Sequence, residues 1–220
     1  MLLPQFIPVL IECTKTENSL LLQPTVYGIG ICAQHAGDQI AAAVPQFVDG
    51  LRAVVSAPGA RDGDIECATD NAVSALIKLA RFRPSQVSAE HVIPSVLAYL
   101  PMKGDSIEAR LIHGWLVDGI LSSDPFWIGA GGVHAAHAMR SFAKVLTLHL
   151  KRAAQAAKAE NEDNNEDDEE DVDPLLDEES IAKMRTFAIA IKNSPQAANV
   201  AGILSTMSLK EVQALRSVGF

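Results

Sequence analysis

Apolar residues along most of the chain recur every three or four positions, the spacing that places them on one face of a helix. This pattern predicts helices over residues 20–35, 66–82 and 106–121, each with one buried face. The residues predicted to form these faces are Leu21, Leu22, Val26, Ile29 and Ala33 in the first helix, Ala68, Ala72, Val73, Leu76, Leu79 and Ala80 in the second, and Ile107, Leu111, Leu116, Val117 and Ile120 in the third. The chain is therefore predicted to be all-α.

A second set of helices is marked by proline. Pro4, Pro45 and Pro94 each follow an apolar residue and precede an apolar run at helical spacing. Proline is tolerated in the first turn of a helix because the backbone N–H that it lacks has no helical partner there. Each of these prolines therefore predicts the start of an equivalent helix.

The two sets alternate as A and B helices at a period of about 40–49 residues, which is typical of HEAT and armadillo arrays. The predicted fold is an α-α superhelix (a solenoid) with HEAT repeats over residues 1–158 and one or more terminal helical cap repeats over 178–220. The first repeat lacks its A helix. We therefore expect the sequence to be the C-terminal piece of a longer protein. The alternative is that Met1 is the true start and that another chain covers this end.

Later helices are predicted over residues 133–158, 178–192, 195–204 and 209–217. The last one opens with Ser208 and Glu211 at the spacing of a capping box. Trp115 is predicted to lie in the core. Trp127 is predicted to anchor a loop or to be an exposed aromatic residue that contacts a partner.

The net charge of the 220 residues is −9, but it is distributed unevenly. Residues 160–179 hold 13 of the 27 acidic residues and no Lys or Arg, so the other 200 residues carry 14 acidic and 18 basic side chains. A block of like charge this dense repels itself and stays solvated. Residues 159–177 are therefore predicted to be a disordered acidic insertion, which is either a solvated loop or an electrostatic decoy or lure for a basic partner.

Motifs for catalysis or for cofactor binding are missing from the sequence. Gly28 and Gly30 have no third glycine for a dinucleotide loop, and His134 and His137 have no further metal ligand close by. We expect no enzyme activity, no cofactor and no metal. Basic residues without interleaved aromatics argue against nucleic-acid binding, and no apolar run is long enough to insert into a membrane.

Two stretches are similar to a known family. Residues 23–34, which read QPTVYGIGICAQ, and residues 68–78, which read ATDNAVSALIK, resemble the C-terminal HEAT repeats of the karyopherin-beta (importin-beta) family, closest to the importin-five, Ran-binding type. The segments around Val92–Pro101, Asp105–Ala109 and Met207–Gln213 resemble later helices of the same type. The acidic insertion is not part of that pattern.

The resemblance implies a nuclear transport receptor that carries protein cargo through the nuclear pore and releases it under Ran-GTP control. The implied partners are protein cargo, the Ran GTPase and nucleoporins, and the implied location is cytoplasm and nucleus. The family's Ran contacts lie chiefly in N-terminal repeats that this sequence does not contain, so no binding residue is carried over. The alternative function is a stand-alone HEAT-repeat scaffold for protein-complex assembly that transports nothing.

Overall fold

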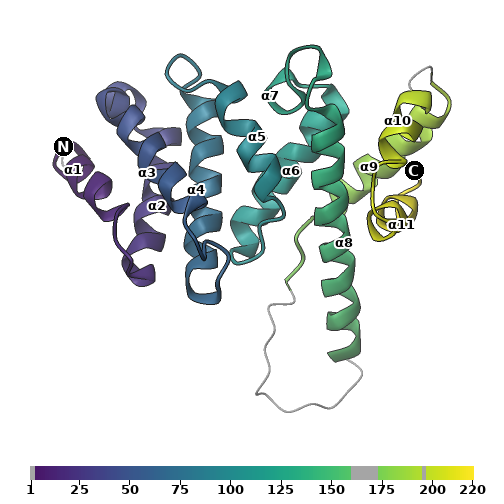
Figure 1. The fold of residues 1–220 in the computed structure, drawn as a ribbon, viewed down its shortest axis with the longest axis horizontal. Coiled ribbons are helices and arrows are strands. Elements are labelled where there is room, and N and C mark those ends of the chain that lie inside the picture. Colours follow the sequence, from purple (N-terminus) through teal and green to yellow (C-terminus); the bar gives the residue numbers. More distant parts are fainter. Residues whose placement is uncertain (1–2, 160–172, 195–196) are drawn as a thin grey trace. The chain divides into compact units, whose positions relative to one another are not determined.

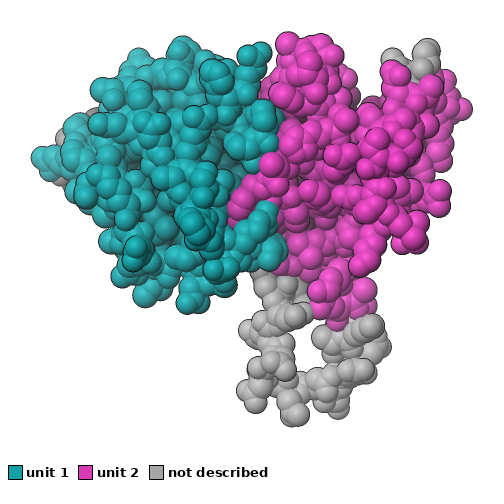
Figure 2. Space-filling view, viewed as in Figure 1, with its two compact units in different colours: residues 1–96, 103–108 teal, residues 97–102, 109–220 magenta. Residues whose placement is uncertain are grey.

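The computed structural model describes residues 3–159, 173–194 and 197–220. These residues form helices, turns and loops, with no strand among them, which confirms the prediction of an all-α chain. The chain divides into two compact units (Figure 2). Unit 1 contains residues 1–96 and 103–108, and unit 2 contains residues 97–102 and 109–220.

Unit 1 is built from pairs of helices joined by short turns (Figure 1). Its elements are α1 (Leu3–Cys13), α2 (Ser19–His35), the 3-10 helix η1 (Gly37–Ala43), α3 (Val44–Ser56), α4 (Gly63–Phe82) and the larger part of α5 (Ala89–Tyr99). Helix α2 packs along α4, α1 packs against α2, and α3 packs against α4. The predicted helices over 20–35 and 66–82 are confirmed as α2 and α4.

Helix α4 is the centre of unit 1, because every residue from Ala68 to Ala80 is buried. Val26 and Ile29 of α2 are fully buried as well. Gly30 allows α2 to approach α4 closely, since a Cβ atom added there would lie 3.5 Å from the Cα atom of Ala75. The six residues predicted to be buried on α4 are all buried, but α4 is buried on every side between Ala68 and Ala80 and not on one face only.

The prolines mark helix starts in two of the three predicted cases. Pro4 and Pro45 lie at the second positions of α1 and α3. The prediction for Pro94 is wrong, because α5 already begins at Ala89 and Pro94 lies inside it. A proline inside a helix removes one backbone hydrogen bond but does not have to end the helix when the surrounding apolar residues are packed.

Unit 2 contains the end of α5 and most of α6 (Ser106–Ser122), and α6 matches the helix predicted over 106–121. Its further elements are α7 (Pro125–Ile128), the 3-10 helix η2 (Ala130–Gly132), α8 (Ala135–Ala159), α9 (Glu178–Lys192), α10 (Ala197–Leu204) and α11 (Leu209–Ser217). Helix α8 packs against α7 and α11, and α9 packs against α10. The Ser208 and Glu211 capping box is present at the start of α11.

The two tryptophans differ in environment. Trp127 of α7 is fully buried and lies against Gly119 of α6, which confirms its prediction as an anchor for the segment between α6 and α8. Trp115 is only partly buried, so its prediction as a core residue is wrong. Its position in α6 lies away from the side that carries the fully buried Leu116 and Val117.

The predicted acidic insertion needs a correction at its C-terminal end. Residues 160–172 lie outside the described residues, but Leu175 and Leu176 are buried in unit 2. The His113 ring contacts the Leu175 carbonyl oxygen through Nδ1 at 2.9 Å, and Arg152 donates to the Asp173 carbonyl oxygen at 3.1 Å. Residues 173–177 therefore belong to the packed part of unit 2, because two adjacent leucines supply apolar surface that the surrounding acidic residues lack.

Candidate functional site

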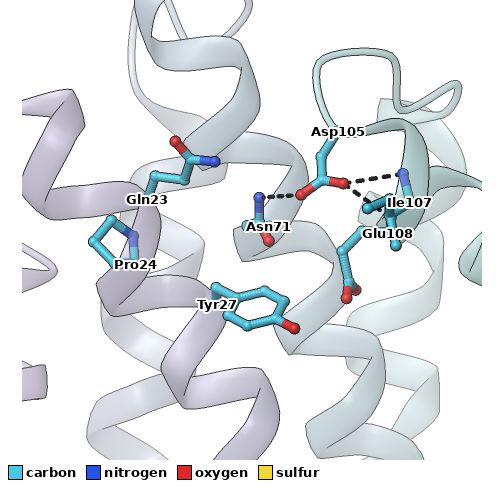
Figure 3. A pocket seen from close by; sticks show the side chains of 7 residues that line it. All are labelled: Gln23, Pro24, Tyr27, Asn71, Asp105, Ile107 and Glu108. Atoms are coloured by element: carbon cyan, nitrogen blue, oxygen red, sulfur yellow. Dashed lines mark hydrogen bonds between the residues drawn. The ribbon is translucent and has the colours of Figure 1, made fainter. Parts of the chain in front are cut away.

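A cleft of about 460 Å³ opens on unit 1 (Figure 3). It is lined by side chains from α2, from α4, from the loop before α6 and from the first turn of α6. The lining residues are Gln23, Pro24, Tyr27, Asn71, Asp105, Ile107 and Glu108. The cleft therefore combines apolar surface with two carboxylates and one buried amide.

The α2 residues that line the cleft do not belong to the buried face of that helix. Leu22, Val26 and Ile29 are buried against the rest of unit 1. At 100° per residue, Pro24 and Tyr27 are on the other side of the helix. Tyr27 accordingly keeps 43% of its surface exposed.

Asp70 of α4 fixes the loop that forms the opposite wall. Its carboxylate is fully buried, and Oδ2 accepts hydrogen bonds from the backbone N–H groups of Lys103 at 2.7 Å, Gly104 at 2.6 Å and Asp105 at 3.3 Å. A Cβ atom on Gly104 would lie 2.9 Å from the backbone nitrogen of Cys67, so the loop approaches α4 this closely only with glycine at that position. The loop is thus held against α4 along its length.

Asn71 carries the buried amide of the cleft. Its Nδ2 group donates to the Cys67 carbonyl oxygen at 3.0 Å and to Asp105 Oδ2 at 2.9 Å. Because both partners can only accept, the orientation of the amide is determined: the nitrogen faces these two oxygens and Oδ1 faces the other way. The side chain is 2% exposed, and Oδ1 has no hydrogen-bond partner.

Asp105 connects the cleft to the first turn of α6. While its Oδ2 accepts from Asn71, its Oδ1 accepts from the backbone N–H groups of Ile107 at 3.1 Å and Glu108 at 3.0 Å. These are the bonds of a side chain that caps a helix N-terminus. The capping geometry places Ile107 at the rim of the cleft.

The prediction that Ile107 and Leu111 belong to the buried face of α6 is wrong. Ile107 is 72% exposed and Leu111 is 36% exposed. Ile112 and Leu116 are fully buried, and Ile107 and Leu111 are on the opposite side of the helix from them. Leu21 of α2 is exposed for the same reason.

Glu108, which lines the cleft, belongs to a buried ion pair. Lys78 of α4 donates to Glu108 Oε2 at 2.7 Å, and the Ser74 hydroxyl donates to the same oxygen. Lys78 is 2% exposed, and its Nζ atom also lies 5.7 Å from the centroid of the Tyr27 ring. Removing one partner of such a pair lowers the free energy of unfolding strongly, because the other charge is left buried without compensation.

The sequence predicts no binding residue. In a superhelix of repeats, five charged residues of the predicted B helices would line the concave surface, and none of them is predicted as a site. These are Asp49, Arg52, Arg140, Lys144 and Lys151. Asp49 and Arg52 lie on α3 of unit 1, where Arg52 donates to the His91 carbonyl oxygen at 2.7 Å. The other three lie on α8 of unit 2, where Arg140 donates to Thr206. Two of these five residues, Arg52 and Arg140, therefore form hydrogen bonds within the chain.

No protein-family model matches this chain. Among the described residues, no group of three or more His, Cys, Asp or Glu side chains is arranged to hold a metal ion. The described helices also include none that is long and apolar enough to cross a membrane. The cleft itself offers apolar surface, hydrogen-bond acceptors and negative charge, which suits it to binding a side chain of a partner.

Proposed function

We propose that this chain is the C-terminal part of a nuclear transport receptor of the importin-beta type, in which HEAT repeats form a superhelix. The receptor would carry protein cargo through the nuclear pore under Ran-GTP control, in contact with nucleoporins. The proposal starts from the resemblance of residues 23–34 and 68–78 to that family.

The regular spacing of the helices is the observation that carries the proposal. The A helices α2, α4 and α6 begin at Ser19, Gly63 and Ser106, so their starts are 44 and 43 residues apart. The B helices α1, α3 and α5 begin at residues 3, 44 and 89, which are 41 and 45 apart. A two-helix unit that recurs at this interval is the defining feature of a HEAT array.

Packing within unit 1 supports the same interpretation. Helix α2 packs along α4, the next A helix in sequence, and α3 packs against α4, the A helix that follows it. Contacts limited to sequence neighbours are what a repeat array requires, since each repeat buries its apolar face only against the adjacent ones. A flexible array of this kind offers long surfaces to protein cargo.

The size of the native protein gives the first test. An antibody raised against this chain should detect a band at roughly 100 kDa in a cell extract, because about 20 repeats of 40–47 residues add up to that mass. The purified protein should then release bound cargo when Ran loaded with GTP is added. Ran loaded with GDP is the matched control and should leave the cargo bound.

The alternative function gives the opposite result. A stand-alone HEAT-repeat scaffold would run near the calculated mass of 23.5 kDa and would keep its partners with either form of Ran. That outcome would replace the transport receptor with a scaffold for protein-complex assembly.

A further inference from the structure

Helix α8 of unit 2 carries positive charge and no negative charge (Figure 1). Its 25 residues include five Lys or Arg residues and no Asp or Glu. The described residues of unit 2 contain eleven basic and seven acidic residues, so this unit is net basic although the complete chain is acidic. A helix without any acidic residue therefore concentrates the positive charge of the unit.

Three of these basic residues lie in one line along α8. At 100° per residue, Arg140, Lys144 and Lys151 are within about 40° of one another around the helix axis. At 1.5 Å per residue, the line that they form is about 16 Å long. Phe142 and Leu146, which are fully buried, lie on the opposite side of the helix. We call Arg140, Lys144 and Lys151 the basic stripe.

The fold leaves the charge of the basic stripe largely uncompensated. Lys151 is exposed and Lys144 is half-buried, and neither forms a hydrogen bond or an ion pair within the described part of the chain. Arg140 donates to the hydroxyl of Thr206 at 2.8 Å, which is a neutral partner. The charge of Glu211 on α11 acts on Arg140 and Lys144, but one carboxylate cannot balance three cations.

Two titratable groups beside the stripe respond to this positive charge. Burial, together with the charges of Lys144 and Arg140, lowers the pKa of His137. Burial acts to raise the pKa of Glu211, but hydrogen bonds with Ser208 and the charges of the same two residues lower it below its usual value. A positive potential favours the deprotonated form of both groups, so both pKa values shift in the direction expected at a surface that attracts anions.

The surroundings of the stripe favour an acidic peptide over other polyanions. Single-stranded nucleic acids stack their bases on aromatic rings, and the aromatic ring on α8, that of Phe142, is buried. A membrane-surface helix inserts its apolar face into lipid, but the apolar face of α8 is packed inside unit 2. An extended peptide rises about 3.3 Å per residue, so about five residues match the length of the stripe.

We propose that the basic stripe of α8 binds an acidic segment, rich in Asp and Glu, of a protein partner. The segment lies along α8 in an extended conformation, and its carboxylates pair with Lys144 and Lys151 and approach Arg140. This inference does not rest on the proposed transport function, because the stripe lies on a single helix that a receptor and a scaffold would present equally.

Three fluorescent probes test the proposal on the full chain. A capped peptide of six alternating Asp and Glu residues is compared with its Asn and Gln counterpart, which has no charge, and with an oligonucleotide of six thymidines. Binding is measured by fluorescence anisotropy at physiological salt, where repulsion from the acidic residues at 160–172 is screened beyond about 8 Å. The acidic peptide should bind about tenfold more tightly than the amide peptide, as three weak ion pairs predict, and no more weakly than the oligonucleotide.

Two double variants localise the binding. Lys144→Gln with Lys151→Gln removes two charges of the stripe and should weaken binding of the acidic peptide about fivefold. The matched control, Arg185→Gln with Lys192→Gln, removes two exposed basic residues of α9 in the same unit and should leave the affinity unchanged. Circular dichroism and the melting temperature show whether both variants fold. Lys151→Gln alone changes an exposed side chain and should still weaken binding about twofold.

Three results would overturn the proposal. Equal binding of the acidic peptide and the amide peptide would show that charge plays no part. An equal loss of affinity in the two double variants would show that the net charge of unit 2, and not the basic stripe, attracts the peptide. Tighter binding of the oligonucleotide than of the acidic peptide would show that the stripe is a nucleic-acid surface.

Discussion

Asp70 shows how one buried residue organises a loop more than thirty positions away. Its carboxylate has no access to solvent and accepts three backbone N–H groups from residues 103–105. Hydrogen bonds to a charged group are stronger than neutral ones, and a carboxylate with several such donors is stable in a buried site. The position of the loop, and with it that of Asp105 at the cleft, depends on this side chain.

Replacing this carboxylate should therefore destabilise unit 1. Asp70→Ala leaves three backbone N–H groups without their acceptor, and we expect a loss of about 3 kcal/mol in the free energy of unfolding. Urea denaturation followed by circular dichroism measures the change. Asp49→Ala, at an exposed position of α3, is the matched control and should change the stability by less than about 0.5 kcal/mol. Equal effects of the two substitutions would contradict the role assigned to Asp70.

His113 makes the stability of unit 2 dependent on pH. The ring is fully buried between the Met102 backbone N–H, which donates to Nε2 at 3.2 Å, and the Leu175 carbonyl oxygen. Burial, together with the charges of Arg152 and His149, lowers the pKa of His113 to about 4, although the hydrogen bond to the Leu175 carbonyl oxygen acts in the opposite direction. The unfolded chain, with a histidine pKa near 6.5, binds the proton more readily than the folded chain.

We therefore expect the contribution of His113 to be fully present above pH 6.5 and to be lost progressively between pH 6.5 and 4. The loss over this window should reach about 3 kcal/mol. His113→Gln supplies one donor and one acceptor but does not titrate, so its free energy of unfolding should depend less steeply on pH. His35→Gln, at an exposed histidine, should keep the wild-type pH dependence. Identical slopes for the wild type and His113→Gln would refute this assignment.

At the scale of elements, α6 and α7 pack against each other because Gly119 of α6 has no side chain. A Cβ atom added to Gly119 would overlap Trp127 Cδ1 and would lie 2.7 Å from Trp127 Cγ. Trp127 is fully buried and cannot move outward without exposing its ring. The small residue in α6 is therefore what allows α7 to pack here.

Gly119→Ala and Gly202→Ala form a matched pair that tests this contact. Overpacking at Gly119 should lower the free energy of unfolding by about 3 kcal/mol. Gly202 lies in α10 with open space around it, and alanine there should raise the stability by about 0.5–1 kcal/mol through its higher helix propensity. Thermal unfolding of both variants gives the comparison. A neutral Gly119→Ala would mean that α7 can shift without cost.

Apolar periodicity and cap residues predicted most helices to within a few residues. These two signals did not predict the start of α5, which begins before Pro94. They also did not predict α7 and η1, because these helices have too few residues to show a period.

The sequence did not predict the cleft, for a different reason. Residues 68–78 were singled out as a family motif, but nothing in the sequence indicates that Asp70 and Asn71 bind residues 103–105. Hydrogen bonds between residues so far apart in sequence follow no period.

At the scale of the whole molecule, the distribution of charge determines how a basic partner approaches. Nine of the 27 acidic residues lie in 160–172, a stretch without Lys or Arg, so the remainder of the chain carries 18 acidic and 18 basic residues. The entire net charge of −9 thus comes from a segment that lies outside the described residues.

Because the net charge lies in one segment, the long-range attraction of a basic peptide can be measured separately from the contacts that hold the bound peptide. Deleting residues 160–172 should slow the association of an arginine-containing basic peptide several-fold at low ionic strength, because long-range attraction scales with net charge. At 0.5 M salt the difference should vanish, since screening then extends over only a few ångströms. Stopped-flow fluorescence measures the rates, and a variant with residues 160–172 replaced by neutral glycine and serine of equal length controls for the change in chain length. The dissociation rate should stay the same in all three chains if contacts with the rest of the chain hold the peptide. A faster dissociation from the deleted chain would instead mean that the acidic segment holds the peptide directly, as a lure of its own.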